Sequence, residues 1–219
     1  MGKALLIFAK QPLPGKVKTR LSPPLSLQEA ADIYRCMLSD TLAKVADLPG
    51  AESFLFFEPA SGALDFFRNA FPGIRIFPQE GDALGERLMK AFEKVFALGF
   101  RSVAAIGTDS PDLPLSHLEE SFRLLEEGGA DVVFGPAADG GYYLVALGTF
   151  CPGLFHDIPW STNRVLEKSN EAAAAFGLQV MTLPVWHDLD TVEDLKRFLV
   201  SGSPENAPRT FRFLQEKRV

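Results

Sequence analysis

The stretch ALLIFAKQPLPGKVKTRL, residues 4–21, indicates the fold class and raises the first functional question. Its first six residues are apolar, as in a buried strand, and are too few for a membrane span or a signal-peptide core. The residues that follow include two prolines, one glycine and four cations, which is typical of a loop. This positive charge needs an explanation, because the whole chain of 219 residues has a net charge of -6.

Short apolar runs alternate with amphipathic stretches along the chain. Strands are predicted at residues 4–9, 53–57, 74–77, 102–106, 131–134, 142–147 and 178–183. Helices are predicted at residues 26–46, 63–69, 86–98, 116–128, 162–175 and 191–200. Three of the helix starts carry capping residues, namely Ser26 with Glu29, Ser116 with Glu119, and Thr191 with Asp194. The alternation predicts an α/β fold with a mostly parallel sheet, followed by a linker and a short basic tail at residues 201–219.

The composition argues against several classes of protein. A sequence pI near 5.2 is unlike that of a general nucleic-acid binder, which presents a basic face. Cys36 and Cys151 form neither a CxxC pair nor a disulfide framework, which favours a reducing compartment. The three histidines lack the spacing of a zinc site. Since no targeting or membrane-spanning segment is visible, we expect a cytoplasmic protein without a nucleic-acid or membrane partner, and the oligomeric state stays open.

The basic loop after the first predicted strand is a candidate phosphate site, because ligands of open α/β sheets bind at the carboxyl ends of strands. If the chain is extended from Lys16 onward, Lys16, Lys18 and Arg20 point to the same side. Three cations on one side suit a di- or triphosphate. The spacing matches neither the Walker loop nor the dinucleotide fingerprint. The alternative is a solvated loop with scattered lysines.

Two carboxylates are candidate ligands of a hard divalent cation. Asp109 follows the strand at 102–106, where oxygen ligands commonly hold Mg²⁺ or Mn²⁺ together with substrate phosphates. We interpret Ser116 as the cap of the next helix, which leaves Asp109 free of that role. Asp190 precedes the last predicted helix and could complete the site. The alternatives are a turn hydrogen bond for Asp109 and a favourable helix-dipole contact for Asp190.

The segment Asp139-Gly140-Gly141 separates two predicted strands. By itself it favours a hairpin turn. The alternative is a contact between these residues and a donor or acceptor group, with the glycines allowing close approach of the backbone.

Together, these motifs resemble the nucleotide-diphospho-sugar transferase superfamily with its GT-A-like fold. Within it, the chain is similar to the bacterial "transferase 1" group found beside radical-SAM and selenodomain proteins, and to the related phospholactate guanylyltransferases. The matching stretches are FAKQPLPGKVKTRL, GDALGERLMKAF, IGTDSPDLP, GPAADGGYYLVAL, IPWST and DLDTVEDL, in family order from residue 8 to residue 195.

This resemblance implies a three-layer α/β/α sandwich around a mixed, mostly parallel sheet, formed by one domain of residues 1–200. The N-terminal half would bind a nucleotide through Lys10, Gly15, Lys16, Lys18, Arg20, Gly81, Leu84, Gly85 and Arg87. The C-terminal half would bind an acceptor through Asp139, Gly140, Gly141, Trp160 and Ser161. Asp109 and Asp190 match the acids that bind Mg²⁺ or Mn²⁺, and Lys18, Arg20 and Asp109 are the expected catalytic residues.

The resemblance also implies a reaction. We expect a metal-dependent transferase that moves a glycosyl group from a nucleoside diphosphate sugar to a small-molecule acceptor. The alternative is a nucleotidyltransferase that joins a nucleoside triphosphate to a phosphorylated molecule, and a second alternative is a non-catalytic nucleotide-binding module. One departure favours the nucleotidyltransferase, because Asp109 and Asp112 are one residue too far apart for the D-x-D motif of many glycosyltransferases. For residues 81–87 a plain helix start also fits, and for Trp160 and Ser161 a hydrophobic staple and helix cap.

Overall fold

A single sheet organises the computed structural model, which describes residues 2–217. Its strands are β1 (Lys3–Ala9), β2 (Ala51–Phe57), β3 (Arg75–Pro78), β4 (Ser102–Ile106), β5 (Val132–Pro136), β6 (Tyr142–Leu147) and β7 (Val180–Thr182). They lie in the order β3-β2-β1-β4-β6-β5-β7. Strand β6 runs antiparallel to both of its neighbours, and the other pairs are parallel. The expected mixed, mostly parallel sheet is therefore confirmed.

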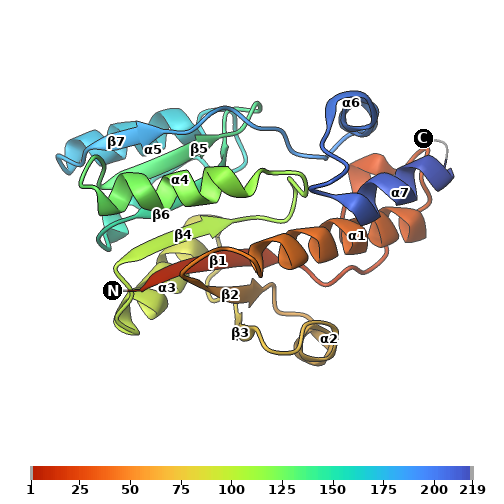
Figure 1. The fold of residues 1–219 in the computed structure, drawn as a ribbon, viewed down its shortest axis with the longest axis horizontal. Coiled ribbons are helices and arrows are strands. Elements are labelled where there is room, and N and C mark those ends of the chain that lie inside the picture. The colour runs from red at the N-terminus through yellow and green to blue at the C-terminus, as the bar shows by residue number, and fades with distance from the viewer. Residues whose placement is uncertain (1, 218–219) are drawn as a thin grey trace.

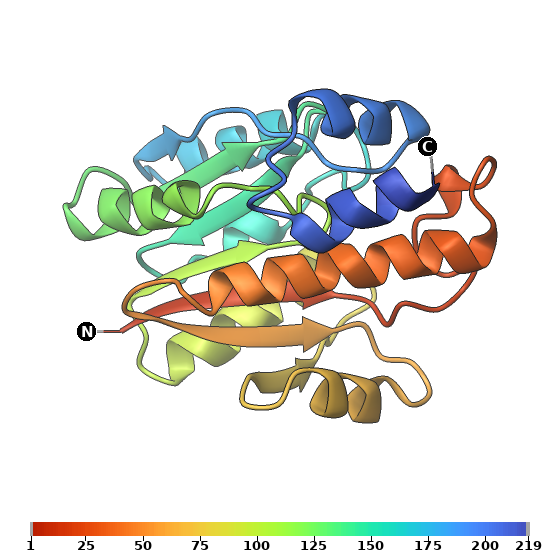
Figure 2. The same cartoon turned by 45° about the vertical axis from the view of Figure 1, so that its right-hand side comes forward.

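Helices cover both faces of this sheet (Figures 1 and 2). They are α1 (Leu27–Val45), α2 (Ala63–Ala70), α3 (Leu84–Ala97), α4 (Leu115–Glu126), α5 (Val165–Ala175), α6 (Val192–Ser201) and α7 (Pro208–Lys217), with 3-10 turns η1 (Thr19–Leu21) and η2 (Pro152–Phe155). Alternate strand residues point to opposite faces, so β1 packs Leu5 and Ile7 against α1, α2 and α4. Its Leu6 packs on the other face, with α3, η2 and α5. The result is the expected three-layer sandwich.

The predicted helix caps have mixed outcomes. Ser26 with Glu29 and Thr191 with Asp194 form complete capping boxes at α1 and α6. The capping box assigned to Ser116 is wrong, because α4 begins at Leu115 and its N-cap is Pro114, two residues before Ser116, with no side-chain hydrogen bond. Pro114, at φ -61° and ψ 138°, brings the chain into the helix before Ser116 is reached.

The expectation of a linker and tail at 201–219 misses helix α7, which packs beside α1 (Figure 1). The start of α7 is held by Asp40 of α1, a fully buried carboxylate. Asp40 accepts hydrogen bonds from the N–H groups of Arg209 and Thr210 and from the Thr210 hydroxyl. No pattern local to residues 201–219 signals this contact, because its acceptor lies 170 positions earlier.

No helix within residues 2–217 combines the length and the apolar composition that a membrane span requires.

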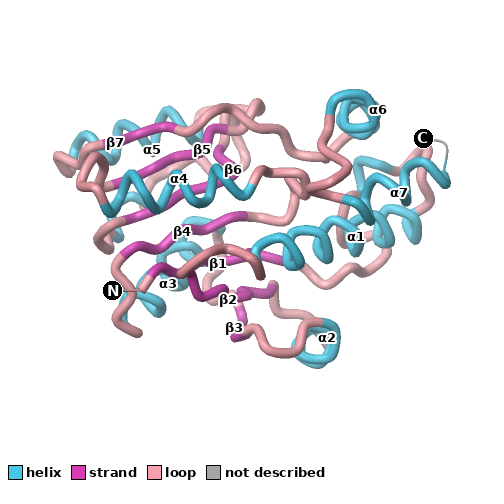
Figure 3. Tube along the Cα trace, in the orientation of Figure 1, coloured by secondary structure: helices cyan, strands magenta, loops and turns pink. Residues whose placement is uncertain are grey.

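Most of the predicted site residues lie in loops. Figure 3 shows loop segments between the sheet and helices α6 and α7. They include the segments that follow β1 and β4 and the segment that precedes α6.

Candidate functional site

A cleft of about 570 Å³ lies beside the carboxyl ends of β1 and β4. Eight of the predicted site residues line it, namely Lys10, Lys16, Lys18, Arg20, Leu84, Arg87, Asp109 and Asp190. The other eight are not among the residues of 2–217 that line it, namely Gly15, Gly81, Gly85, Asp139, Gly140, Gly141, Trp160 and Ser161. A larger cavity of about 770 Å³ between α1, α2 and the start of β3 contains none of the predicted residues.

The basic loop reaches this cleft by a different backbone path from the one expected. Lys18 has a left-handed conformation, with φ 46° and ψ 39°, and Thr19–Leu21 then form a 3-10 turn. The predicted extended alternation is therefore wrong, because neither conformation places alternate residues on one side. Lys16 and Arg20 are exposed, whereas the Lys18 side chain is only 4% exposed. Together with the exposed Lys10, the loop thus supplies three exposed cations and one buried cation to the same cleft.

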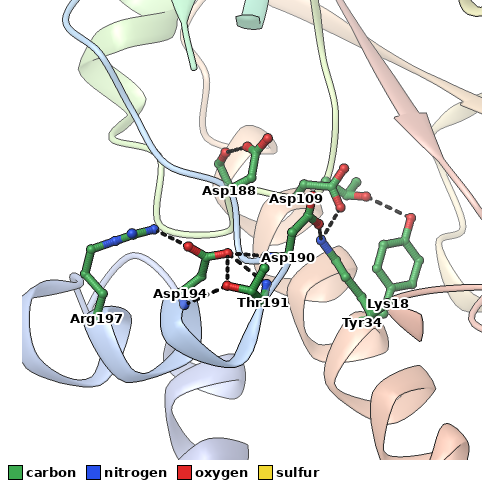
Figure 4. Close-up of polar contacts among 10 residues, drawn as sticks. Lys18, Tyr34, Asp109, Asp188, Asp190, Thr191, Asp194 and Arg197 are labelled. Atoms are coloured by element: carbon green, nitrogen blue, oxygen red, sulfur yellow. Dashed lines mark hydrogen bonds and ion pairs between the residues drawn. The ribbon is translucent and has the colours of Figure 1, made fainter. Parts of the chain in front are cut away.

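The buried cation joins the two predicted metal ligands (Figure 4). Lys18 Nζ lies 2.5 Å from Asp109 Oδ1 and 2.7 Å from Asp190 Oδ1. Burial acts to lower the pKa of Lys18, but the two carboxylates outweigh it and hold the pKa above its usual value. Lys18 therefore carries its charge at neutral pH, and it neutralises part of the acid pair.

The two aspartates have fixed backbones. The carbonyl of Asp109 accepts a hydrogen bond from the N–H of Leu189 at 2.8 Å, which ties the loop after β4 to the segment before α6. The N–H of Asp190 donates to Asp194 Oδ2 at 3.1 Å, as part of the cap of α6 (Figure 4). The side chains of Asp109 and Asp190 are 48% and 44% exposed, so both remain open to a ligand.

Asp188 is a third carboxylate near this pair, and it is not among the predicted site residues. Its Oδ1 accepts a hydrogen bond from the Ser110 hydroxyl at 2.6 Å. Burial, together with the nearby charge of Asp109, raises the pKa of Asp188 to about 6. Asp188 lines a small cavity of about 70 Å³ that also reaches Asp109 and Lys44. The sequence signal for it was its position two residues before Asp190.

Tyr34 of α1 also belongs to the site, although the sequence analysis did not identify it. Its hydroxyl accepts a hydrogen bond from the Lys10 N–H at 2.9 Å and lies 2.8 Å from the hydroxyl of Thr108. Burial and the charge of Asp109 raise the pKa of Tyr34 to about 12. Within its helix, Tyr34 resembles any other aromatic residue on a buried face, so no pattern marks it out.

Arg87 of α3 also lines the cleft. Its Nη1 lies 3.0 Å from Glu58 Oε1, and its Nε donates to the carbonyl of Gly81 at 2.9 Å. Glu58 also pairs with Lys10 at 3.7 Å. These contacts hold the Arg87 side chain in the cleft lining, and Gly81 contributes by accepting a hydrogen bond through its carbonyl. Gly81 has a positive φ of 124°, which favours glycine. Leu84 is exposed and lines the same cleft.

Gly85 and Trp160 pack against each other outside the cleft lining. A Cβ at Gly85 would lie 2.4 Å from Trp160 Nε1, so a glycine is needed for this contact. Trp160 also meets Tyr142 edge to face, with ring centroids 6.2 Å apart. The neighbouring Ser161 does not cap α5, because that helix starts after Arg164 without a side-chain cap.

The glycine segment forms the hairpin turn that its sequence favoured. Asp139 Oδ1 accepts a hydrogen bond from the N–H of Gly141 at 2.9 Å, between the antiparallel strands β5 and β6. A Cβ at Gly140 would lie 2.2 Å from the carbonyl oxygen of Asn163, so only a glycine leaves room for the segment that contains Asn163. Acceptor binding by these residues stays a prediction. From the strand that follows this turn, Tyr142 and Tyr143 line the cleft.

Asp109 and Asp190 fit a divalent cation that is shared with a ligand. Among residues 2–217 no group of three or more His, Cys, Asp or Glu side chains is arranged to hold a metal ion. Mg²⁺, however, usually binds proteins through one or two carboxylates and completes its shell with water and substrate phosphates. The two half-exposed carboxylates meet that requirement, with Lys18 already between them.

The comparisons with known proteins agree with this fold. The family model described as "Uncharacterized protein conserved in bacteria (DUF2064)" matches residues 41–162. A candidate nucleotide-diphospho-sugar transferase of known structure from Desulfovibrio desulfuricans G20 is 34% identical, with a TM-score of 0.92, over 100% of this chain and 96% of that one. None of the curated proteins compared matches the chain.

More distant structures share the fold alone. CMP:2-keto-3-deoxy-manno-octonic acid synthetase, solved with CTP, is 12% identical with a TM-score of 0.56 over 100% of both chains. Rv0371c from Mycobacterium tuberculosis H37Rv, solved with manganese, is 17% identical with a TM-score of 0.55 over 92% of this chain and 99% of that one. Since the family model covers more than half of the sequence, the chain belongs to the DUF2064 family of conserved bacterial proteins and has a nucleotidyltransferase-like α/β fold.

Proposed function

We propose that the protein is a transferase that holds a nucleoside diphosphate sugar by its phosphates in this cleft and passes the glycosyl group to a small acceptor. The observation that carries the proposal is the convergence of the basic loop after β1 with Asp109 and Asp190 on one cleft. The likeness to the candidate nucleotide-diphospho-sugar transferase along the whole chain supports it.

The distribution of charge supports a diphosphate. Lys10 and Arg87 share Glu58, and Lys18 is held by two aspartates. Lys16 and Arg20 form no ion pair with any other residue of the described range 2–217, which leaves two exposed cations in the cleft lining. Two positive charges match the two negative charges of a diphosphate ester, and the guanidinium of Arg20 can bind two oxygens at once.

These residues would promote the reaction by stabilising negative charge. An acceptor hydroxyl oxygen forms a bond to the anomeric carbon and gives up its proton to water or to the departing diphosphate. The bond from that carbon to the diphosphate breaks, and the nucleoside diphosphate leaves with the bonding electron pair. Lys16 and Arg20 stabilise the negative charge that grows on the departing diphosphate. Mg²⁺ or Mn²⁺ bound by Asp109 and Asp190 would add to that stabilisation.

Nucleotidyl transfer is the second candidate, and the position of Asp112 favours it. Asp112 is 7% exposed, and it accepts a hydrogen bond from Trp186 Nε1 at 3.2 Å. The loop after β4 therefore offers Asp109 to the cleft without the second acid of a D-x-D motif. In this reaction a phosphate oxygen of the acceptor would attack the α-phosphorus of a nucleoside triphosphate, and pyrophosphate would leave.

A thermal-shift panel separates these reactions. The full-length protein is heated with nucleoside mono-, di- and triphosphates and with nucleotide sugars, each with and without Mg²⁺ or Mn²⁺. A ligand at a hundred times its Kd adds ~2.7 kcal/mol, which for a chain of this size is a shift of roughly 5–10 °C.

We expect metal-dependent stabilisation by one nucleoside diphosphate and its sugar conjugate. Preference for a single triphosphate would replace this proposal with nucleotidyl transfer, and no shift with any nucleotide would reject both.

A further inference from the structure

One ammonium group bridges the two carboxylates that are expected to bind a metal ion. Lys18 Nζ contacts a single oxygen of Asp109 and a single oxygen of Asp190, at 2.5 and 2.7 Å (Figure 4). A divalent cation on the same two oxygens would lie within a few ångströms of this ammonium. Because like charges at such a separation repel strongly in a partly buried site, the lysine and the metal ion compete for the acid pair.

The lysine is held in this position against a backbone preference. Lys18 has φ 46°, a left-handed conformation that residues other than glycine seldom adopt. Its side chain is 4% exposed, so the ammonium has given up most of its contact with water. Two charge-assisted hydrogen bonds to the carboxylates offset both costs. The contact is therefore a specific feature of the loop and differs from a surface ion pair.

The lysine is also the partner with the longest reach, because its ammonium lies on a flexible four-carbon stem. Asp109 and Asp190 are tied down by the hydrogen bonds of their backbones to Leu189 and Asp194. The neighbours of Lys18 in the loop, Lys16 and Arg20, are exposed and line the same cleft. Phosphates bound there would offer the flexible lysine side chain a second set of negatively charged oxygens.

We propose that Lys18 acts as an internal cation in place of a divalent metal ion, and that nucleotide phosphates draw it away, so that nucleotide and metal bind the protein together. Without a nucleotide, Lys18 already neutralises one of the two negative charges of the acid pair, which lowers the affinity of the pair for Mg²⁺ or Mn²⁺. With a nucleotide, Lys18 moves to the phosphates and the two carboxylates become available. The first half of this inference, that Lys18 takes the place of a metal ion, concerns the free protein alone. The second half, that nucleotide phosphates draw Lys18 away, rests on the proposed function.

The first experiment measures Mn²⁺ binding to the full-length protein without nucleotide, by the electron paramagnetic resonance signal of free Mn²⁺. We expect weak binding to the parent protein and binding at least ~10-fold tighter to Lys18→Met, since that variant leaves both carboxylates without a cation. Lys18→Arg retains the positive charge and should bind as weakly as the parent.

Lys16→Met is the matched control. It removes the same charge from the same loop and cleft, but Lys16 forms no ion pair with the other residues that the structure describes. Its affinity for Mn²⁺ should stay near that of the parent. An equal gain in Lys16→Met and Lys18→Met would point to the general charge of the cleft and would overturn the proposal.

Folding of each variant is checked by its melting temperature. Methionine is not β-branched, so the substitution adds no new strain at the left-handed position. If Lys18→Met does not fold, Lys18→Gln takes its place, because the neutral amide still donates hydrogen bonds to the carboxylates. A folded, neutral variant at position 18 that binds Mn²⁺ no more tightly than the parent rejects the inference.

The second experiment repeats the titration with the nucleoside diphosphate that stabilises the protein most in the thermal-shift panel. Mn²⁺ bound by the nucleotide alone is measured without protein and subtracted. We expect the nucleotide to raise the affinity of the parent for Mn²⁺ by ~10-fold or more, and to raise that of Lys18→Met by less. An equal rise in both proteins contradicts the proposed role of Lys18. If no nucleotide binds, the proposed function fails, and the contrast between Lys18→Met and Lys16→Met still decides the first half.

Discussion

The hydroxyl of Tyr34 lies 2.8 Å from the hydroxyl of Thr108, and this contact joins helix α1 to the loop after β4. The same Tyr34 oxygen accepts the N–H of Lys10, at the beginning of the basic loop. One buried phenol therefore sets the position of two loops that carry opposite charges and face the same cleft.

Replacing Tyr34 by Phe retains the ring and removes both contacts. Because the partly buried N–H of Lys10 and the buried hydroxyl of Thr108 lose their partner, we expect a loss of about 1–3 kcal/mol in the free energy of unfolding, measured by urea denaturation. Nucleotide affinity, measured by calorimetry, should fall as well because the loops are no longer held together. A variant with unchanged stability and affinity would show that Tyr34 has no part in positioning the loops.

Arg20 is expected to bind phosphate without supporting the fold. It is exposed and lines the cleft. Arg20→Ala should weaken nucleotide binding ~10- to 100-fold, the usual effect of losing hydrogen bonds to a charged group, and should leave the melting temperature unchanged. Arg123→Ala is the control, since Arg123 lies exposed on α4 and pairs with Glu120 and Glu127. Equal affinity in Arg20→Ala and the parent would remove Arg20 from the site.

Lys44 should make stability depend on pH in the alkaline range. Burial lowers the pKa of Lys44 from 10.5 to about 8, against the opposing effect of nearby Asp112 and Asp40. Between these two values the unfolded chain binds more protons than the folded protein, so stability rises as the pH increases from about 8 to 10.5. The charged form costs about 3 kcal/mol below pH 8.

Lys44→Met removes the charge at similar size, although it also removes the hydrogen bond from Lys44 Nζ to the carbonyl of Pro111. We expect urea denaturation at several pH values to show a flatter dependence in Lys44→Met than in the parent. The exposed Lys196 of α6 offers the control Lys196→Met, which should keep the slope of the parent. If stability changed equally with pH in all three proteins, a lowered pKa of Lys44 would be excluded.

Asp40 should anchor helix α7 through hydrogen bonds more than through its ion pair. Asp40 is fully buried, whereas its partner Arg209 is 55% exposed. Asp40→Ala leaves two N–H groups and a hydroxyl at the start of α7 without this acceptor and should cost about 3–5 kcal/mol. Arg209→Ala should cost only about 0–1 kcal/mol, as for other exposed ion pairs.

Limited proteolysis provides a second measurement of the same anchor. Asp40→Ala should be cut faster than the parent in the segment before α7, at 202–207, because the helix is released from α1. Similar losses of stability in Asp40→Ala and Arg209→Ala would instead assign the anchor to the ion pair.

Most of the elements could be predicted from the sequence, because apolar spacing is a local property. Alternating strands and helices, the two capping boxes at Ser26 and Thr191, and the hairpin at Asp139 to Gly141 each depend on residues close together in the chain. The predictions failed where a distant contact or a single backbone angle decided the outcome. The N-cap of α4 is Pro114 instead of Ser116, and Lys18 has a left-handed conformation. The start of α7 is held by Asp40, which lies far away in the sequence.

Local patterns were enough to predict the fold class and the charged loops, because the carboxyl ends of parallel strands meet at one edge of a sheet. How those charges are combined depends on contacts that form only when the chain folds. Lys18 and Asp190 are 172 positions apart, and no local pattern states that the lysine meets this acid and Asp109 while Lys16 and Arg20 stay exposed. That pairing depends on strand order, on the cap of α6 and on the turn at Lys18, which act together only in the folded chain.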